Sequence, residues 1–96
     1  MDGQTWYSIQ KIAELVRERL ELTLPITSEK LIEGISKIDG RCIPDVDGIL
    51  GRKDASVFEL NKEEDGYEFE ILYNVKCSEQ GKTFAIAREL GRFLIN

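Results

Sequence analysis

Residues 67–96 read YEFEILYNVKCSEQGKTFAIARELGRFLIN, and the hydrophobic period changes within this segment, which indicates a strand followed by a helix. Over residues 67–74 the side chains alternate between two sides. One side carries Tyr67, Phe69, Ile71 and Tyr73, and the other carries Glu68, Glu70 and Asn74. A period of two is typical of a strand with one buried face, so we predict a half-buried strand here.

The period changes after Asn74. Ser78 is a favoured helix N-cap, and Glu79 places a negative charge at the positive end of the helix that follows. We therefore predict a helix over residues 79–95. Its expected inward stripe consists of Phe84, Ala87, Leu90, Gly91 and Leu94.

Shorter elements precede this strand. Residues 61–66 are polar and end in Asp-Gly, which predicts a hairpin loop, and the apolar residues 57–60 favour a strand. Residues 42–43 favour a short edge strand, because Pro44 cannot donate to a central ladder. The turn-forming residues 45–54 predict a loop. Together these segments predict a small antiparallel β-sheet.

Two helices are predicted before the sheet. Between residues 6 and 22, apolar residues recur at helical spacing, namely Ile9, Ile12, Ala13, Val16 and Leu20. After Pro25, Thr27 or Ser28 can cap a second helix that carries Leu31, Ile35 and Ile38. The order helix, helix, sheet, helix predicts an α+β fold, and a chain of 96 residues makes one domain over residues 1–96.

The composition excludes several classes of function. The chain has 13 Lys and Arg against 18 Asp and Glu, and its net charge of −5 repels phosphates, so we expect no nucleic-acid partner. The absence of histidine excludes a Ser-His-Asp triad and every zinc site that needs an imidazole. No apolar run reaches the ~20 residues of a membrane span, and we expect no membrane partner.

The expected compartment is the cytoplasm. The N-terminus, Met1-Asp2-Gly3-Gln4, is acidic and polar, unlike a signal peptide or a transit peptide. Cys42 and Cys77 lie far apart and form no CxxC pair. We interpret them as two small buried thiols of a protein in a reducing compartment.

The last predicted helix also carries a family resemblance. Residues 84–95, FAIARELGRFLI, resemble the motif helix of ImmA/IrrE-type zinc metallopeptidases, which typically reads Phe-x-x-Ala-His-Glu-Leu-Gly-His followed by apolar residues. The matching positions are Phe84, Ala87, Glu89, Leu90, Gly91 and the run Phe93-Leu94-Ile95. The strand at 71–74 that ends in Asn and the Leu24-Pro25-Ile26 turn between the first two helices are similar to the family's N-terminal order. The resemblance covers essentially this whole chain, which corresponds to the N-terminal part of a usual member.

Both motif histidines are replaced, by Arg88 and Arg92. The resemblance implies that these are the metal-ligand positions and that Glu89 stands at the general-base position. An arginine side chain stays protonated and offers a metal no lone pair. The family also takes a further ligand, commonly acidic, from a segment after this helix, whereas the present chain stops at Asn96. We therefore expect no catalytic residue, no bound metal and no cofactor.

Two interpretations of Arg88 and Arg92 stay open. In the first, both are solvated helix residues, and Glu89 pairs with Arg92 at i, i+3. Such a pair stabilises a helix by ~0.2–0.5 kcal/mol. Alternatively, they form an anion or carboxylate site in the place where the family holds its metal.

The resemblance leads to three hypotheses about function. The favoured one is a catalytically inactive metallopeptidase-like domain that acts as a protein-binding regulatory module in a phage or mobile element. Its partner would be a helix-turn-helix regulator, since active members of the family act on such repressors. The alternative is an active zinc metallopeptidase fragment or component that cleaves such a repressor. A third is a structural remnant without activity.

The end of the last helix is a candidate interface. Phe93, Leu94 and Ile95 are consecutive apolar residues, which span too much of a helix circumference for one inward face to bury. At least one of them should lie on the surface, and exposed apolar patches commonly mark interfaces. This predicts a homodimer through the helix, or a partner protein that covers the same residues.

Overall fold

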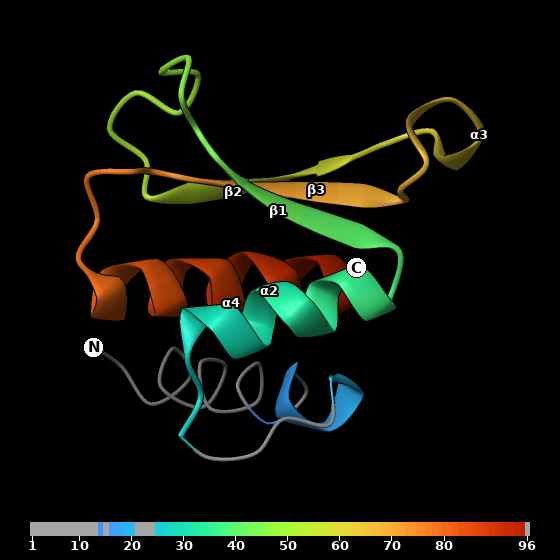
Figure 1. Cartoon of the computed structure of the whole chain (residues 1–96), viewed down its shortest axis with the longest axis horizontal. Helices are drawn as coiled ribbons and strands as arrows, with labels where there is room; N and C mark the ends of the chain where they lie inside the picture. Colours follow the sequence, from blue (N-terminus) through green and yellow to red (C-terminus); the bar gives the residue numbers. More distant parts are fainter. Residues whose placement is uncertain (1–13, 15, 21–24, 96) are drawn as a thin grey trace.

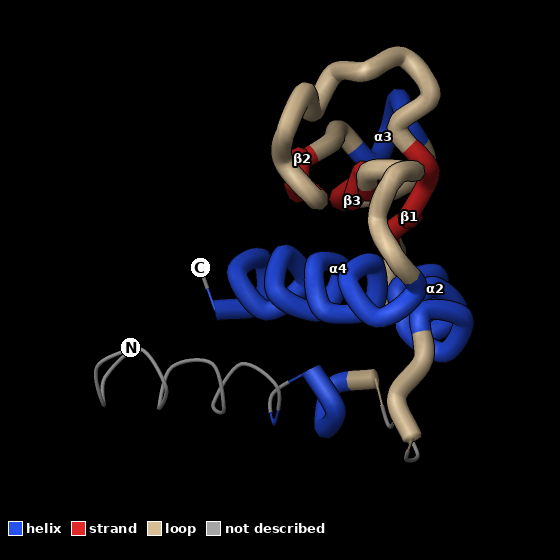
Figure 2. The backbone as a smooth tube through the Cα atoms, turned by 90° about the vertical axis from the view of Figure 1, so that its left-hand side faces the viewer, coloured by secondary structure: helices blue, strands red, loops and turns tan. Residues whose placement is uncertain are grey.

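The computed structural model of the chain describes residues 14, 16–20 and 25–95. The described elements are α2 (Ser28–Lys37), β1 (Gly40–Pro44), β2 (Ala55–Glu59), α3 (Lys62–Asp65), β3 (Phe69–Tyr73) and α4 (Glu79–Ile95). Helices α2 and α4 cover one face of the sheet, and residues 16–20 lie on the other side of these helices (Figures 1 and 2). The predicted α+β order is confirmed.

Of the helix predicted over residues 6–22, residues 14 and 16–19 are helical, and the remainder lies outside the described residues. Val16 and Leu20 are buried in the main core. The helix predicted after Pro25 is α2, and the side chain of its N-cap, Thr27, accepts a hydrogen bond from the Lys30 amide. Within the described ranges, no helix is long and apolar enough to cross a membrane.

The sheet is mixed, so the prediction of a purely antiparallel sheet is wrong. The strand order is β1-β3-β2, with β2 antiparallel and β1 parallel to β3. The chain reverses direction after β1 and again after β2, so β1 and β3 run the same way. Strand β3, which carries the most buried residues, is inserted between the other two. The edge position predicted for residues 42–43 is confirmed, because β1 pairs only with β3 among the described strands.

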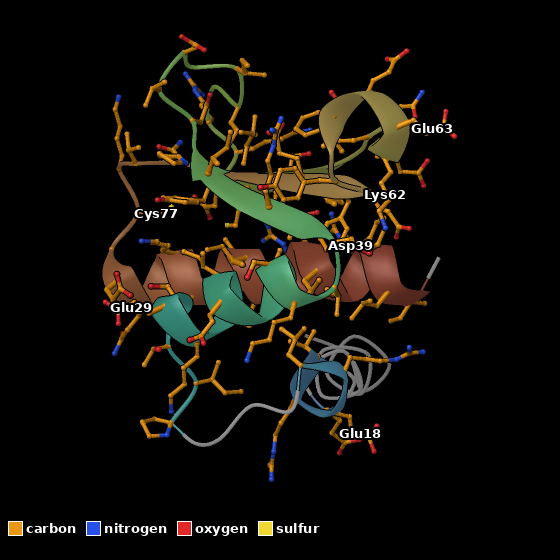
Figure 3. The ribbon with its side chains drawn as sticks, turned by 45° about the vertical axis from the view of Figure 1, so that its right-hand side comes forward. Glu18, Glu29, Asp39, Lys62, Glu63 and Cys77 are labelled. Carbon is orange, nitrogen blue, oxygen red and sulfur yellow. The ribbon has the colours of Figure 1, made fainter. Side chains whose placement is uncertain are left out.

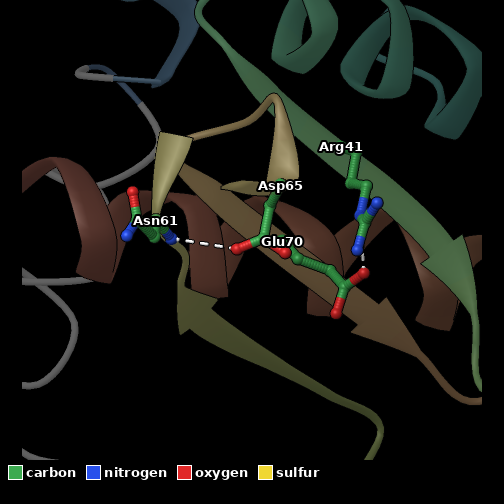
Figure 4. A network of polar contacts seen from close by, with 4 residues as sticks. All are labelled: Arg41, Asn61, Asp65 and Glu70. Carbon is green, nitrogen blue, oxygen red and sulfur yellow. Dashed lines mark hydrogen bonds and ion pairs between the residues drawn. The ribbon is translucent and has the colours of Figure 1, made fainter. Parts of the chain in front are cut away.

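The segment predicted as a hairpin loop at 61–66 contains a short helix, α3. The side chain of Asn61 accepts a hydrogen bond from the Glu63 amide, which caps the helix, and Asp65 Oδ2 accepts one from the Asn61 amide (Figure 4). Gly66 ends α3 with φ of 81°, a conformation that glycine adopts without a steric penalty. The Asn and Asp-Gly residues that indicated a turn therefore cap one turn of helix instead.

The core lies between the sheet and the two long helices. It contains Phe69 and Ile71 from β3, Leu31 and Ile35 from α2, and Ile86 and Leu90 from α4. At one end, the Phe69 ring stacks on Phe93 with centroids 4.1 Å apart. Gly40 lies against the same ring, where an added Cβ would be 2.3 Å from Phe69 Cζ. The start of β1 therefore approaches β3 closely only because residue 40 has no side chain.

Helix α4 begins and ends where it was predicted, but its predicted inward stripe is partly wrong. The buried residues are Ala85, Ile86, Glu89, Leu90 and Gly91. Phe84 is 54% exposed, and Ala87 and Leu94 are half-buried. The helix contacts the sheet and α2 together, so the buried strip runs through positions 85, 86, 89 and 90, which share one side at a spacing of four.

Candidate functional site

Arg88, Glu89 and Arg92, the residues of the predicted motif, line a cleft between α4 and the start of β2. The cleft has a volume of about 360 Å³. Its lining residues are Arg52, Lys53, Asp54, Ala55, Ser56, Arg88, Glu89 and Arg92, and we call it the α4–β2 cleft. Helix α4 contributes three of these residues, and two of them are arginines.

Glu89 lies at the inner side of the α4–β2 cleft and is only 4% exposed. Its Oε1 is 3.2 Å from Arg92 Nη1, in a hydrogen bond, and 3.4 Å from Arg88 Nε. Burial of a carboxylate is costly unless it is paired, and both cations meet that requirement here. The predicted i, i+3 pair of Glu89 with Arg92 is confirmed, and Arg88 adds a second cation beside the same oxygen.

The two arginines differ in their surroundings. The Arg92 side chain is 60% exposed, whereas that of Arg88 is 33% exposed. In the described part of the chain, Arg88 Nε is the buried side-chain donor that has no hydrogen-bond acceptor. Buried donors in proteins are nearly always paired, so this N–H has an unmet hydrogen bond. The interpretation of Arg88 as an ordinary solvated residue does not account for it.

The opposite wall of the cleft includes residues 52–54, in a loop that Asn74 holds in place. The Asn74 side-chain amide donates to the carbonyl oxygens of Gly51 and Lys53 at 3.3 and 3.1 Å, and its backbone amide donates to that of Asp54 at 2.7 Å. The asparagine at the end of β3 therefore positions the loop that faces α4. Arg52, Lys53 and Asp54 were not predicted as site residues. The signal that could have indicated them was Asn74, a polar side chain directly after an apolar strand, because it holds their loop in place.

The two cysteines are free and are not activated. Burial raises the pKa of the Cys42 thiol to about 12, although nearby Lys82 acts in the opposite direction. Burial and then a hydrogen bond to Asp54, at 3.4 Å, raise the pKa of Cys77, which lies in the connection between β3 and α4 (Figure 3). A nucleophilic cysteine needs the opposite shift. Neither thiol therefore has the properties of a catalytic nucleophile.

The residues of the α4–β2 cleft do not fit a zinc ion. The side chains at the predicted motif positions are those of Arg88, Glu89 and Arg92. The two guanidinium groups donate hydrogen bonds and have no lone pair with which to bind a metal. Among the described residues, no three His, Cys, Asp or Glu side chains are grouped so that they could hold a metal ion. The chemistry that this site can perform is the binding of hydrogen-bond acceptors.

A second, larger groove of about 460 Å³ lies between the N-terminal ends of α2 and α4. Ile26, Phe84 and Ala87 give it an apolar lining, and Ser28 donates a hydrogen bond to Glu79 beside it. None of Arg88, Glu89 and Arg92 lines this groove. The groove is thus separate from the motif residues.

The predicted interface at the end of α4 is smaller than expected. Ile95 is 56% exposed, which confirms that at least one of the three apolar residues lies on the surface. Phe93 and Leu94 are half-buried against the core, and Phe93 belongs to the stack with Phe69. Self-association through this end of the helix stays a prediction, with Ile95 as the residue that tests it.

The opposite end of the sheet carries separate ion pairs. Lys62 Nζ lies 2.9 Å from Asp39 Oδ2, and the two labelled side chains face each other in Figure 3. The Asp39 carboxylate, by its hydrogen bond and its charge, raises the pKa of Lys62. Arg41 Nε pairs with Glu70 Oε1 at 2.7 Å across β1 and β3 (Figure 4). None of these four residues lines the α4–β2 cleft.

Comparisons of the chain with models of protein families, with curated proteins and with solved structures found no match. The resemblance to ImmA/IrrE-type metallopeptidases therefore stays a prediction that rests on the motif residues of α4 and the order of elements before it.

Proposed function

We propose that the chain is a catalytically inactive, metallopeptidase-like domain that acts as a regulatory module by binding another protein. The observation that carries this proposal is the pairing of Glu89 with both Arg88 and Arg92. A general base in a metallopeptidase takes a proton from a metal-bound water. Here the Glu89 carboxylate is paired with two arginines, with Oε1 accepting a hydrogen bond from Arg92, in a site whose side chains do not fit a metal.

The binding role is supported by the charges of the α4–β2 cleft. Four cationic side chains and only two carboxylates line it. The cationic residues are Arg52, Lys53, Arg88 and Arg92, and the acidic ones are Asp54 and Glu89. This local excess of positive charge lies on a chain whose net charge is −5. A patch of opposite sign to the rest of a protein attracts a partner of complementary charge and orients it. We propose a helix-turn-helix regulator as the partner, on the strength of the family resemblance.

The test is capture of partners from the source cell with three tagged proteins. They are the wild type, the cleft variant Arg88→Ala/Arg92→Ala and the control Arg17→Ala/Arg19→Ala, whose arginines are exposed on the N-terminal helical segment. We expect the wild type and the control to retain an intact helix-turn-helix protein that the cleft variant loses. Retention by all three would exclude the cleft as the binding surface. Chelator-sensitive cleavage of the partner would support the metallopeptidase alternative.

A further inference from the structure

We infer that the α4–β2 cleft binds a single carboxylate, the side chain of an aspartate or glutamate in an acidic segment of the partner protein. This inference deepens the proposed function and rests on it for the identity of the carboxylate's source. Its starting point is Arg88, whose Nε is buried without an acceptor. Nε itself lies against Glu89 Oε1 at 3.4 Å, but the Arg88 side chain is 33% exposed and no side-chain hydrogen bond from its terminal Nη atoms to a described residue is present, so these Nη donors are available to a ligand.

The cleft supplies more cationic groups than its own carboxylates neutralise. Arg52 and Lys53 are exposed on its outer wall, and neither makes an ion pair with a described residue. Glu89, at 5% side-chain exposure, lies behind Arg88 and Arg92 and so presents little negative surface to an incoming anion. The accessible part of the site is therefore net positive, because its cationic side chains outnumber the one exposed carboxylate, that of Asp54.

Glu89 is a positioning residue in this arrangement. Its Oε1 contacts both guanidinium groups, at 3.2 and 3.4 Å, and restrains two long side chains that otherwise rotate freely. Restraint of this kind lowers the ordering cost that a ligand must meet on binding. The remaining N–H groups of two restrained guanidiniums present the forked donor pattern that matches the two oxygens of a carboxylate.

The dimensions and the overall charge favour a single carboxylate over a polyphosphate. A cleft of about 360 Å³ is at the small end of ligand sites and has room for one acidic side chain with its adjoining backbone. The net charge of −5 repels the long array of phosphates in a nucleic acid, whereas one carboxylate responds mainly to the charges within a few ångströms. The ligand class that fits both observations is an acidic protein segment.

The probe is a pair of blocked tripeptides, acetyl-Gly-Glu-Gly-amide and acetyl-Gly-Gln-Gly-amide, which differ only in the carboxylate. Each is titrated into the ¹⁵N-labelled full chain while the Nε–Hε signals of the arginines are followed by NMR. We expect the Glu peptide to shift the Arg88 and Arg92 signals saturably at millimolar concentration, and the Gln peptide to leave them unchanged. Arg88→Ala or Arg92→Ala should raise the Kd about tenfold or more, because each removes a charge-assisted contact.

Two further variants keep the test valid if an alanine variant is unstable. Arg88→Lys retains the charge and loses the fork, so it should bind the Glu peptide more weakly than the wild type. Arg17→Ala, remote from the cleft, should bind it as the wild type does. Equal shifts with the Glu and Gln peptides, or no saturable shift at either arginine, would overturn the inference. Tighter binding of inorganic phosphate than of the Glu peptide would assign the cleft to phosphates instead.

These results are separable from those of the capture experiment. Binding of the Glu peptide together with partner capture that is indifferent to Arg88→Ala/Arg92→Ala would leave the carboxylate site standing and remove the proposed function. If the variant loses capture but the wild type does not bind the Glu peptide, the proposed function stands and the carboxylate site is removed. The partner would then contact the cleft through other chemistry.

Discussion

The carboxylate of Glu89 and the guanidinium of Arg92 lie one helical turn apart on α4, with Oε1 and Nη1 separated by 3.2 Å. Glu89 is buried and Arg92 is largely exposed, so we expect their removal to lower the free energy of unfolding by different amounts. Glu89→Ala leaves Arg88 and Arg92 close together without the carboxylate that pairs with both, and we expect it to lower the free energy of unfolding by about 1–3 kcal/mol. Arg92→Ala leaves Arg88 beside Glu89 and should cost less than about 1 kcal/mol. Urea unfolding measures both, and equal losses would contradict the burial of Glu89.

The rotation of α4 is tested by two substitutions on its apolar residues. Leu90 is fully buried and Phe84 is mostly exposed, although both were expected to face inward. Leu90→Ala should cost about 2–5 kcal/mol because it leaves a cavity between the sheet and the helices. Phe84→Ala should cost about 1 kcal/mol or less. If Phe84→Ala proves to be the more destabilising change in thermal unfolding, the helix is rotated from the orientation described.

The close approach of Gly40 to Phe69 predicts a steric penalty. An alanine Cβ at residue 40 would be 2.3 Å from Phe69 Cζ, so the ring and its stacking partner Phe93 would have to move. We expect Gly40→Ala to destabilise the protein by about 1–3 kcal/mol. The matched control is Gly81→Ala, in the first turn of α4, where the nearest atom to an added Cβ is Ser78 Oγ at 3.2 Å. The control should not destabilise, since alanine favours a helix more than glycine does.

The raised pKa of Cys42 predicts a loss of stability at alkaline pH. The folded protein keeps the Cys42 proton up to about pH 12, whereas the unfolded chain releases it near pH 9. Between these values the unfolded state binds fewer protons, so stability falls as the pH rises, by up to about 1.4 kcal/mol per pH unit for this one group. Other groups titrate in this range, so the measurement is the difference between wild type and Cys42→Ala in unfolding free energy from pH 8 to 11. A difference that does not change with pH would contradict the burial of this thiol.

Self-association is tested at Ile95, the most exposed apolar residue at the end of α4. If the predicted homodimer forms through this end of the helix, light scattering behind size exclusion should give twice the chain mass at tens of micromolar. Ile95→Glu should return it to the monomer without unfolding it, because Ile95 lies outside the core. Phe93→Glu is unsuitable as a test, since Phe93 stacks on Phe69. A single-chain mass for the wild type at every concentration would refute the homodimer.

Local pattern was sufficient to predict much of the fold. The α4 bounds were predicted as observed, because Ser78 precedes an uninterrupted run of helix-compatible residues. The alternation at 67–74 identified β3, whose Phe69 and Ile71 belong to the core formed with the helices. The direction of β1 relative to β3 was not predictable in this way, because it depends on which strand takes the centre of the sheet. The turn residues Asn61 and Gly66 cap a helix as readily as they close a hairpin.

The site was predictable only in part, for a similar reason. Arg88, Glu89 and Arg92 were identified from their spacing on one helix. Arg52 lies 36 positions before Arg88, and only the packing of β2 against α4 and the Asn74 hydrogen bonds bring its loop to the cleft. Which side of α4 is buried depends on its packing against both α2 and the sheet. The apolar character of Phe84 predicted an inward position, and that prediction is wrong because neither α2 nor the sheet covers this side chain.

An NMR titration distinguishes binding of a hydrogen-bond acceptor at Arg88, Glu89 and Arg92 from binding of a metal ion. The Nε–Hε signal of Arg88 and the backbone amide signal of Glu89 are followed while the wild-type protein receives equimolar zinc chloride and then the acetyl-Gly-Glu-Gly-amide peptide. We expect no change with zinc and a saturable shift of the Arg88 signal with the peptide. A stoichiometric shift of Glu89 with zinc, without a response of Arg88 to the peptide, would assign these residues to a metal site instead.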